Sequence, residues 1–254
     1  MRDAFELGES AAGFQVLTFE TIGSTNDAAL ALARLGGPDR CWLIAKTQTA
    51  GRGRHGRKWA SPPGNLYASL LLIDAVPRAR APQLGFVAGV ALARALRVLV
   101  AEEARLKLKW PNDILFGGAK LGGILLDGAE LANGGFASII GLGVNCSCYP
   151  RDVDYPATAL CETGASVSSP QDVFAELSSE MAHWLEIFDA GNGFAAVRGE
   201  WLALADGLGA PVKIATPARR LEGRFKTIDS SGRLVLENES GVLAIESGDV
   251  ILGH

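Results

Sequence analysis

The sequence predicts an α+β fold, in which helices flank a mixed β-sheet domain and a small β-barrel follows at the C-terminal end. Two observations support this prediction. Apolar runs of strand length alternate with segments of helical periodicity through most of the 254 residues. After Gly207 the pattern changes to five short strands separated by turn signals, such as residues 229–232 and 238–241. We therefore predict two domains, residues 1–206 and residues 207–254.

The first part of the larger domain alternates strands with helices. Ser24-Thr25-Asn26 directly follows a strand, and Ser24 or Thr25 is a favourable N-cap for the helix that comes next. Apolar residues from Leu84 to Leu99 recur at helical spacing, which predicts a long helix packed on the core. The predicted strands cover residues 14–20, 41–45 and 65–73, and the predicted helices cover about 27–35 and 81–104.

The second part begins with a strand that a proline ends. Residues 106–109 alternate apolar with cationic side chains, so Lys107 and Lys109 share one face. Pro111 stops this strand because proline cannot donate to a ladder of hydrogen bonds. Ser169 followed by Pro170 predicts a helix start. Further strands are predicted at 114–116, 120–126 and 139–145, and helices from 170 onward and over about 194–204.

Residues 51–58, Gly-Arg-Gly-Arg-His-Gly-Arg-Lys, form the most unusual stretch of the chain. Four cationic side chains and three glycines lie together in a protein of net charge −4. This composition favours neither helix nor strand, which predicts a mobile loop that closes on an anion. The stretch contains G-x-G-x-x-G, but Pro62 and Pro63 follow where a dinucleotide-binding fold needs a helix. Arg57 stands at the P-loop lysine position without a strand-to-helix junction around it.

The overall composition argues against several classes of protein. A net charge of −4 with one basic loop does not suit general nucleic-acid binding, which needs a broad positive surface. The four cysteines include no C-x-x-C pair, which indicates reduced thiols and no zinc site. The N-terminus lacks the apolar core of a signal peptide, and no apolar run is long enough to span a membrane. We therefore expect a cytoplasmic protein that binds neither DNA nor a membrane.

Several polar residues have both a structural and a functional interpretation. Ser24-Thr25-Asn26 can cap a helix, yet the same turn presents hydroxyls, an amide and backbone N–H groups to a small polar ligand. Gly122 and Gly123 would let a ligand lie against the backbone. Asp113 is either a turn residue that bonds its own backbone or an acid–base group. Trp59 is either a core aromatic residue or a ligand contact.

A series of motifs in fixed order resembles the biotin protein ligases, and the resemblance spans nearly the whole chain. It implies a sheet domain like that of class II synthetases and an SH3-like C-terminal barrel. About twenty residues precede the first motif, too few for a helix-turn-helix domain, so repressor function is not expected. The motifs are Ser24-Thr25-Asn26, Gln48-Thr49-Ala50 before the loop, Trp59, Pro63-Gly64-Asn65-Leu66-Tyr67, Lys109-Trp110-Pro111-Asn112-Asp113, Lys120-Leu121-Gly122-Gly123-Ile124-Leu125, Gly141-Leu142-Gly143-Val144-Asn145 and Ala157-Thr158.

The resemblance implies two half-reactions. Biotin and ATP, with Mg²⁺ on the phosphates, form biotinyl-5′-AMP and pyrophosphate, and biotin is then transferred to a lysine of a biotin carboxyl carrier protein domain. That lysine is protonated at pH 7, so a group must take its proton, and Asp113 is the candidate. The residues implied are Lys120, Arg52 and Asp113 for catalysis; Ser24, Thr25, Asn26, Gln48, Arg52, Gly53, Arg54, Lys120, Gly122 and Gly123 for biotin; and Arg54, Arg57, Trp59, Lys109, Asn112 and Asn145 for the nucleotide.

Two other functions are left open by the sequence, as are the metal ligands, the acceptor carboxylase and the formation of a homodimer. A lipoate ligase or octanoyltransferase shares the implied fold, but the transferase needs a nucleophilic cysteine. Cys146 and Cys148 follow a strand with no partner lysine motif. A non-enzymatic nucleotide- or RNA-binding module would bind with an affinity that falls steeply with salt, and it would form no product.

Overall fold

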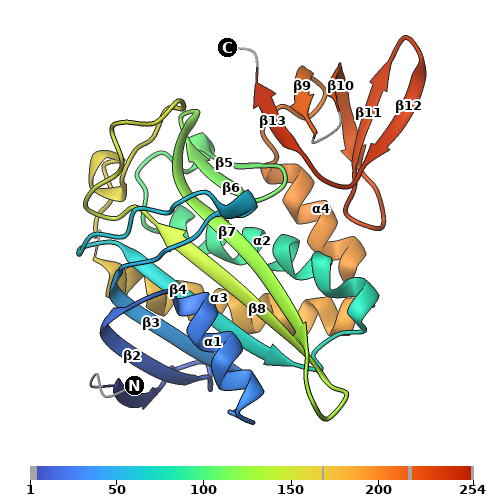
Figure 1. Ribbon diagram of the computed structural model, residues 1–254. Helices are drawn as coiled ribbons and strands as arrows, with labels where there is room; N and C mark the ends of the chain where they lie inside the picture. Colours follow the sequence, from blue (N-terminus) through green and yellow to red (C-terminus); the bar gives the residue numbers. More distant parts are fainter. Residues whose placement is uncertain (1–4, 168, 217–218, 253–254) are drawn as a thin grey trace.

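An eight-stranded mixed sheet forms the larger domain (Figure 1). The computed structural model describes residues 5–167, 169–216 and 219–252. Strands β2 and β3 are parallel and are connected by helix α1 (Thr25–Arg34), whereas all other neighbouring strands are antiparallel. The strands are β1 (Phe5–Glu9), β2 (Gln15–Ile22), β3 (Cys41–Gln48), β4 (Leu66–Ile73), β5 (Leu106–Lys109), β6 (Asp113–Phe116), β7 (Ala119–Glu130) and β8 (Phe136–Val144), in the order β1-β2-β3-β4-β8-β7-β6-β5.

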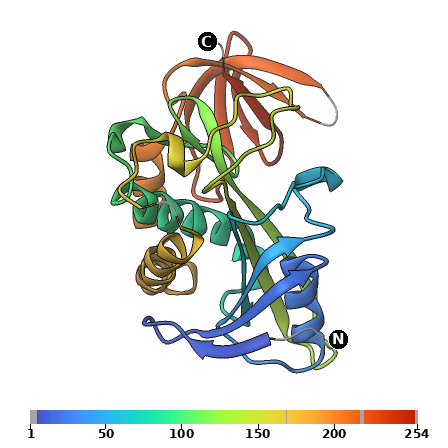
Figure 2. The same ribbon diagram turned by 90° about the vertical axis from the view of Figure 1, so that its left-hand side faces the viewer.

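Helices cover both faces of this sheet (Figure 2). On one face, Ala29 and Ala33 of α1 pack against Leu43, Leu71 and Ile139. On the other face, α2 (Leu84–Arg97), α3 (Pro170–Phe188) and α4 (Phe194–Leu204) enclose the main core. In the described residues, no helix has the length and apolar character needed to cross a membrane. Short 3₁₀ turns lie at Arg54–Gly56, Arg78–Gln83, Glu103–Arg105, Leu160–Glu162 and Asp189–Gly191.

The last strands form a separate antiparallel sheet, and its buried apolar residues, such as Phe225 and Leu234, are continuous with the main core. A turn of this sheet packs on the larger domain, because the Trp110 indole donates to the Gly232 carbonyl at 3.3 Å and the Gln83 amide donates to the Ser230 carbonyl at 3.2 Å. The sheet is consistent with an SH3-like barrel, and we propose that its domain begins at residue 207. Its strands are β9 (Pro211–Ala215), β10 (Arg220–Ile228), β11 (Leu234–Asn238), β12 (Gly241–Ile245) and β13 (Asp249–Leu252), in the order β12-β11-β10-β9-β13.

The α+β architecture is confirmed, and most predicted elements lie within a few residues of those observed. The helix predicted over 81–104 is too long at both ends. Pro82 lies in a 3₁₀ turn before α2, and after α2 the chain turns back toward β5. Leu99 and Val100 remain in the core beyond the end of the helix, which is why the apolar spacing continues. The edge strand β1 was not predicted, because five residues that include Gly8 carry a weak strand signal.

Candidate active site

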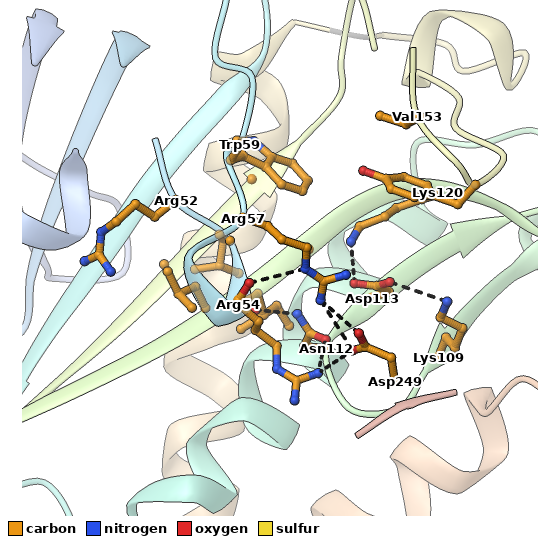
Figure 3. A pocket seen from close by; sticks show the side chains of 18 of the residues that line it. Arg52, Arg54, Arg57, Trp59, Lys109, Asn112, Asp113, Lys120, Val153 and Asp249 are labelled. Atoms are coloured by element: carbon orange, nitrogen blue, oxygen red, sulfur yellow. Dashed lines mark hydrogen bonds and ion pairs between the residues drawn. The ribbon is translucent and has the colours of Figure 1, made fainter. Parts of the chain in front are cut away.

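A cavity of about 760 Å³ opens between the sheet, residues 51–58 (the arginine loop) and the C-terminal barrel (Figure 3). The start of α1, the β5–β6 hairpin, β7 and β13 all contribute to its wall. All but two of the site residues predicted from the sequence line this cavity. They are Ser24, Thr25, Asn26, Gln48, Arg52, Gly53, Arg54, Arg57, Trp59, Lys109, Asn112, Asp113, Lys120 and Gly123.

The two exceptions are Gly122 and Asn145, which are not among the residues that line the cavity. A Cβ atom on Gly122 would lie 2.8 Å from the carbonyl oxygen of Gly143, so this glycine allows close approach of β8. The Asn145 amide donates to the Thr158 carbonyl at 3.0 Å, and its backbone N–H donates to Leu121 at 2.9 Å. In this structure, Asn145 holds the segment after β8 against β7.

The polar end of the cavity is built at the start of α1. The Ser24 hydroxyl accepts the backbone N–H of Asp27 at 3.3 Å, which confirms the predicted N-cap. Thr25 donates to the Gln48 side-chain oxygen twice, from its backbone N–H at 2.8 Å and from its hydroxyl at 3.1 Å. The Gln48 amide nitrogen in turn donates to the Ser61 hydroxyl at 3.0 Å. These bonds fix the orientation of the polar side chains that face the cavity.

Asn26 connects this polar end to the middle of the sheet. Its Nδ2 donates to Asp127 at 2.9 Å, and its Oδ1 accepts from the Ser69 hydroxyl at 2.6 Å. A Cβ atom on Gly141 would collide with the Asn26 amide, so the glycine makes room for it. Ser69 is fully buried on β4 and was not among the predicted site residues. Its signal in the sequence is one polar residue in an otherwise apolar strand.

Asp113 lies between two lysines on one face of the hairpin (Figure 3). Lys120 Nζ is 2.6 Å from Oδ1, and Lys109 Nζ is 3.6 Å from Oδ2. Lys109 is the direct cross-strand partner of Asp113. A bulge between Ile114 and Leu115 shifts the register of β7, and this shift brings Lys120 to the same face. The three side chains are 14–25% exposed, so the charges interact in a partly desolvated site.

The arginine loop is closed by its own backbone. The Gly53 N–H donates to Arg57 at 2.6 Å, and the Trp59 N–H donates to Gly51 at 2.9 Å. His55 has a φ of +56°, in the left-handed region, where the chain reverses. The next regular element is β4, with no helix between, so this G-x-G-x-x-G does not open the helix of a dinucleotide-binding fold.

Two arginines of this loop bind the C-terminal barrel. Arg54 Nη1 lies 3.2 Å from Asp249 Oδ1, and Arg57 Nη2 lies 3.1 Å from Asp249 Oδ2. Arg54 also donates to the Asn112 side chain at 3.3 Å. Burial lowers the pKa of the Arg54 guanidinium, and the Asp249 carboxylate opposes this shift. Asp249 was not predicted, because nothing in its local sequence relates it to a loop almost two hundred residues away.

Arg52 is directed away from the centre of the cavity, although its residue lines the wall (Figure 3). Its guanidinium lies 2.5 Å from Asp27 Oδ1 and 3.3 Å from Asp127 Oδ2. The hydrogen bond that Arg52 donates to the Asp27 carboxylate is the main reason that the pKa of Arg52 is raised. Arg52 therefore contacts carboxylates of the chain in this structure, and it reaches the cavity only by a change of rotamer.

Trp59 rests on a flat patch of backbone made by two glycines. Gly123 and Gly143 are opposite each other in β7 and β8. A Cβ atom would lie 3.3 Å from the Trp59 ring at Gly123 and 2.7 Å from it at Gly143. The sequence predicted that a ligand would use the space next to Gly123, which stays a prediction; in this structure the Trp59 indole lies beside that glycine.

Tyr155 also lines the cavity and was missed by the sequence analysis. The Lys120 ammonium lies between two aromatic rings, 5.5 Å from the centroid of Trp59 and 5.4 Å from that of Tyr155. Both distances are within the range of cation–π attraction. The cavity thus combines a fixed polar end with a group of cations and aromatic faces, which suits an anionic ligand that also has a small polar head group.

The cysteines lie outside the cavity wall. Burial raises the pKa of the Cys146 thiol to about 12 and that of Cys41 to about 11. Both thiols are therefore protonated at neutral pH and are poor nucleophiles. Because none of the four cysteines lines the cavity, the structure disfavours acyl transfer through a cysteine at this site, which an octanoyltransferase requires.

Comparison with known proteins identifies relatives along nearly the whole chain. The model of the Biotin/lipoate A/B protein ligase family matches residues 19–145, and that of the Biotin protein ligase C terminal domain matches residues 207–253. The biotin–[acetyl-CoA-carboxylase] ligase of Paracoccus denitrificans is 38% identical over 236 residues, covering 91% of this chain and 97% of that protein. The ligase of the same name from Mycobacterium tuberculosis is 32% identical, with 96% and 91% covered.

A solved structure matches the fold with similar coverage. The biotin protein ligase of Aquifex aeolicus in complex with biotin and ATP superposes with a TM-score of 0.76 at 28% sequence identity. The match covers 93% of this chain and 97% of that one, so it includes both the larger domain and the C-terminal barrel.

Proposed function

This chain belongs to the biotin protein ligases of the biotin/lipoate A/B protein ligase family, and we propose that its cavity joins biotin to a carrier protein in two ATP-dependent steps. The observation that carries the proposal is the convergence of Lys109, Asp113 and Lys120 with the arginine loop, opposite a polar end built on α1. The relatives supply the substrates, because the Paracoccus protein is a biotin–[acetyl-CoA-carboxylase] ligase and the Aquifex structure contains biotin and ATP.

In the first step, an oxygen of the biotin carboxylate attacks the α-phosphorus of ATP, and the bond from that phosphorus to pyrophosphate breaks. Two anions must approach each other, so the site has to supply positive charge. Lys120, Arg54 and Arg57 lie at the cavity wall and can bind the phosphate and carboxylate oxygens. We assign the polar end, with Ser24, Thr25, Asn26 and Gln48, to the biotin head group.

In the second step, the carrier lysine attacks the carbonyl carbon of biotinyl-5′-AMP and AMP leaves. We assign Asp113 as the group that takes a proton from this lysine, because it is the carboxylate of the β5–β7 face that lines the cavity. Lys109 holds the second oxygen of Asp113 and so fixes the orientation of the carboxylate. Trp59 and Asn112 are proposed nucleotide contacts at the same wall.

The residues present fit Mg²⁺ as a companion of the ATP phosphates. Mg²⁺ in nucleotide sites is commonly bound through phosphates and water with few protein carboxylates. In the described part of the chain, no three His, Cys, Asp or Glu side chains are placed to hold a metal, and both oxygens of Asp113 face lysines. When bound, Mg²⁺ would neutralise phosphate charge.

The proposed partner is the biotin carboxyl carrier domain of an acetyl-CoA carboxylase, and the proposed location of the reaction is the cytoplasm. DNA is not a proposed partner, because the net charge is −4 and the densest group of basic side chains is confined to one loop of eight residues. Sedimentation of the purified protein, with and without biotin and ATP, measures whether a homodimer forms.

Mass spectrometry tests the proposed function directly. A carrier domain incubated with this protein, ATP and biotin should gain the mass of one biotinyl group. The first step is measured separately by exchange of labelled pyrophosphate into ATP, which should depend on biotin. Exchange that responds instead to lipoate or octanoate would assign the chain to the other branch of its family, and the absence of any exchange would refute the proposal.

A further inference from the structure

Asp127 lies behind the cavity, where its carboxylate contacts both the polar end and the arginine loop. Oδ2 of Asp127 accepts the Asn26 amide at 2.9 Å, and the same oxygen lies 3.3 Å from Arg52 Nη2. We propose that Asp127 is a positioning residue, whose one oxygen sets the direction of the Asn26 amide and anchors the base of the arginine loop. This inference rests on the proposed function. Asp127 does not line the cavity, so it acts on a ligand through these two side chains.

The first role of Asp127 is to orient Asn26. A carboxylate accepts hydrogen bonds and does not donate them, so the NH2 group of Asn26 must face Asp127. This group also donates to the Leu125 carbonyl at 3.4 Å, and Oδ1 of Asn26 accepts from the Ser69 hydroxyl at 2.6 Å. Both amide protons are thus used within the protein, and one lone pair of Oδ1 remains for a ligand. Asn26 therefore presents an acceptor to an N–H group of the biotin head group.

The second role of Asp127 is to hold the arginine loop. Arg52 and Lys58 form a β-bridge across the base of the loop, so the position of Arg52 sets the position of both ends. The Arg52 guanidinium lies on Asp127 from β7 and on Asp27 from α1. A planar guanidinium that meets two carboxylates from different elements is held in one orientation. The loop base is therefore tied to the two elements that also position Asn26.

Asp27 serves as a comparison, because its carboxylate shares only one of the two roles. It pairs with Arg52 and, in the described part of the chain, makes no hydrogen bond to the Asn26 side chain. The side chains of Arg52 and Asp27 are 40% and 55% exposed, whereas that of Asp127 is 29% exposed. Ion pairs between exposed side chains contribute little. Of the two carboxylates, Asp127 should therefore matter more for the loop, and Asp127 alone should matter for the head group.

Two measurements separate the two roles. The Kd of biotin without ATP reports on the polar end. The rate at which preloaded, labelled biotinyl-5′-AMP dissociates into an excess of the unlabelled compound reports on the loop. Asp127→Ala removes both contacts, so it should raise the Kd and the dissociation rate about tenfold each, the factor for one hydrogen bond to a charged group. Asp27→Ala should raise the dissociation rate by about fivefold at most and leave the Kd unchanged.

Asp127→Asn tests the assignment with a conservative change. Its amide oxygen can accept from both Asn26 and Arg52, but it carries no charge. The Kd of biotin should therefore return to within about threefold of the wild-type value, because the bond to Asn26 is kept. The dissociation rate should stay raised, because the ion pair with Arg52 is lost. Dissociation from the wild type should also become faster at high salt concentration, and this increase should be smaller in Asp127→Ala.

Glu130→Ala is the matched control. Glu130 is on the same strand as Asp127, pairs with Arg78 and does not line the cavity, so this variant should keep both wild-type values. If Asp127→Ala lowers the melting temperature but changes neither the Kd nor the dissociation rate, Asp127 is only structural and the inference is wrong. If Asp127→Asn binds biotin as weakly as Asp127→Ala, the orientation of Asn26 is not set in this way. A wild-type chain without biotin-dependent pyrophosphate exchange would instead remove the proposed function, and the inference with it.

Discussion

Replacement of Lys120 by alanine separates the two roles that the structure gives to this side chain. Lys120 pairs with Asp113 at 2.6 Å, and it is the cation proposed to stabilise charge at the α-phosphate. The first role contributes to folding and the second to the rate of adenylation. Loss of the lysine should therefore lower both the melting temperature and the rate of biotin-dependent pyrophosphate exchange, by amounts that can be estimated independently.

The loss of stability follows from the burial of the pair. The side chains of Lys120 and Asp113 are 18% and 14% exposed, so removal of one partner leaves a partly desolvated charge. Breaking a fully buried pair costs about 3–5 kcal/mol. Asp113 still has an ion pair with Lys109 at 3.6 Å, so we expect a smaller loss of about 1–3 kcal/mol in the free energy of unfolding. For a chain of this length, that corresponds to a melting temperature lower by roughly 2–12 °C.

The loss of rate follows from the charge at the transition state. Deletion of one preorganised donor to a developing oxyanion costs about 2.7–4 kcal/mol, so exchange should fall by about 10²- to 10³-fold. Lys107→Ala is the control, because Lys107 is on β5 two residues before Lys109 but does not line the cavity. The double variant Lys120→Ala with Asp113→Asn removes the carboxylate that has lost its nearer partner, so it should recover part of the melting temperature but not the exchange.

The outcome that contradicts this reasoning is equally specific. If Lys120→Ala keeps more than about a tenth of the wild-type exchange, Lys120 does not bind the reacting phosphate, since even one ordinary charged hydrogen bond is worth about that factor. If the double variant recovers exchange together with stability, the effect of Lys120→Ala was on folding alone.

Two further predictions concern packing and pH. Gly143→Ala places a Cβ atom 2.7 Å from the Trp59 ring, so it should lower the free energy of unfolding by about 1–3 kcal/mol and raise the KM for ATP. The control is Gly199→Ala in α4, which has open space around the new Cβ atom and should not destabilise the protein. Equal melting temperatures of the two variants would contradict the packing argument. Burial raises the pKa of Cys41 to about 11 and that of Cys146 to about 12, from an ordinary 9.0, so above pH 9 the unfolded thiols ionise first and stability falls. In urea unfolding, the free energy of unfolding should be about 1.4 kcal/mol lower per thiol at pH 10 than at pH 7.5. The variant with both cysteines changed to alanine should not show this decrease. An identical decrease in wild type and variant would exclude these thiols as the cause.

The local parts of the site could be predicted from the sequence because each depends on a few adjacent residues. The Ser24 cap depends on a side chain that bonds the N–H three residues later. Lys109 and Asp113 face each other because Pro111 and Asn112 turn the chain between two short strands. Such features appear in the spacing of residue types, and the resemblance to a family then assigns a function to them.

The parts that could not be predicted depend on contacts between distant segments. Lys120 reaches the face of Asp113 only through the bulge in the β6–β7 ladder, and a bulge leaves no pattern in residue type here. Arg52 turns toward Asp27 and Asp127, which come from α1 and β7. A missing side chain does not specify what fills the space beside Gly123, which was predicted for a ligand, and the structure places Trp59 beside that glycine.

These distant contacts have one feature in common, the pairing of cavity cations with carboxylates of the chain. Three groups of carboxylates pair with five of the cations that line the cavity: Asp27 with Asp127 on Arg52, Asp249 on Arg54 and Arg57, and Asp113 on Lys109 and Lys120. An anionic substrate that binds these cations therefore exchanges places with carboxylates that are already there. Ion pairs of the more exposed kind, such as Arg57 with Asp249, are worth about 0.2–1 kcal/mol, so their exchange costs little. The pair of Lys120 with Asp113 is more buried, and its exchange leaves behind a carboxylate that keeps only Lys109.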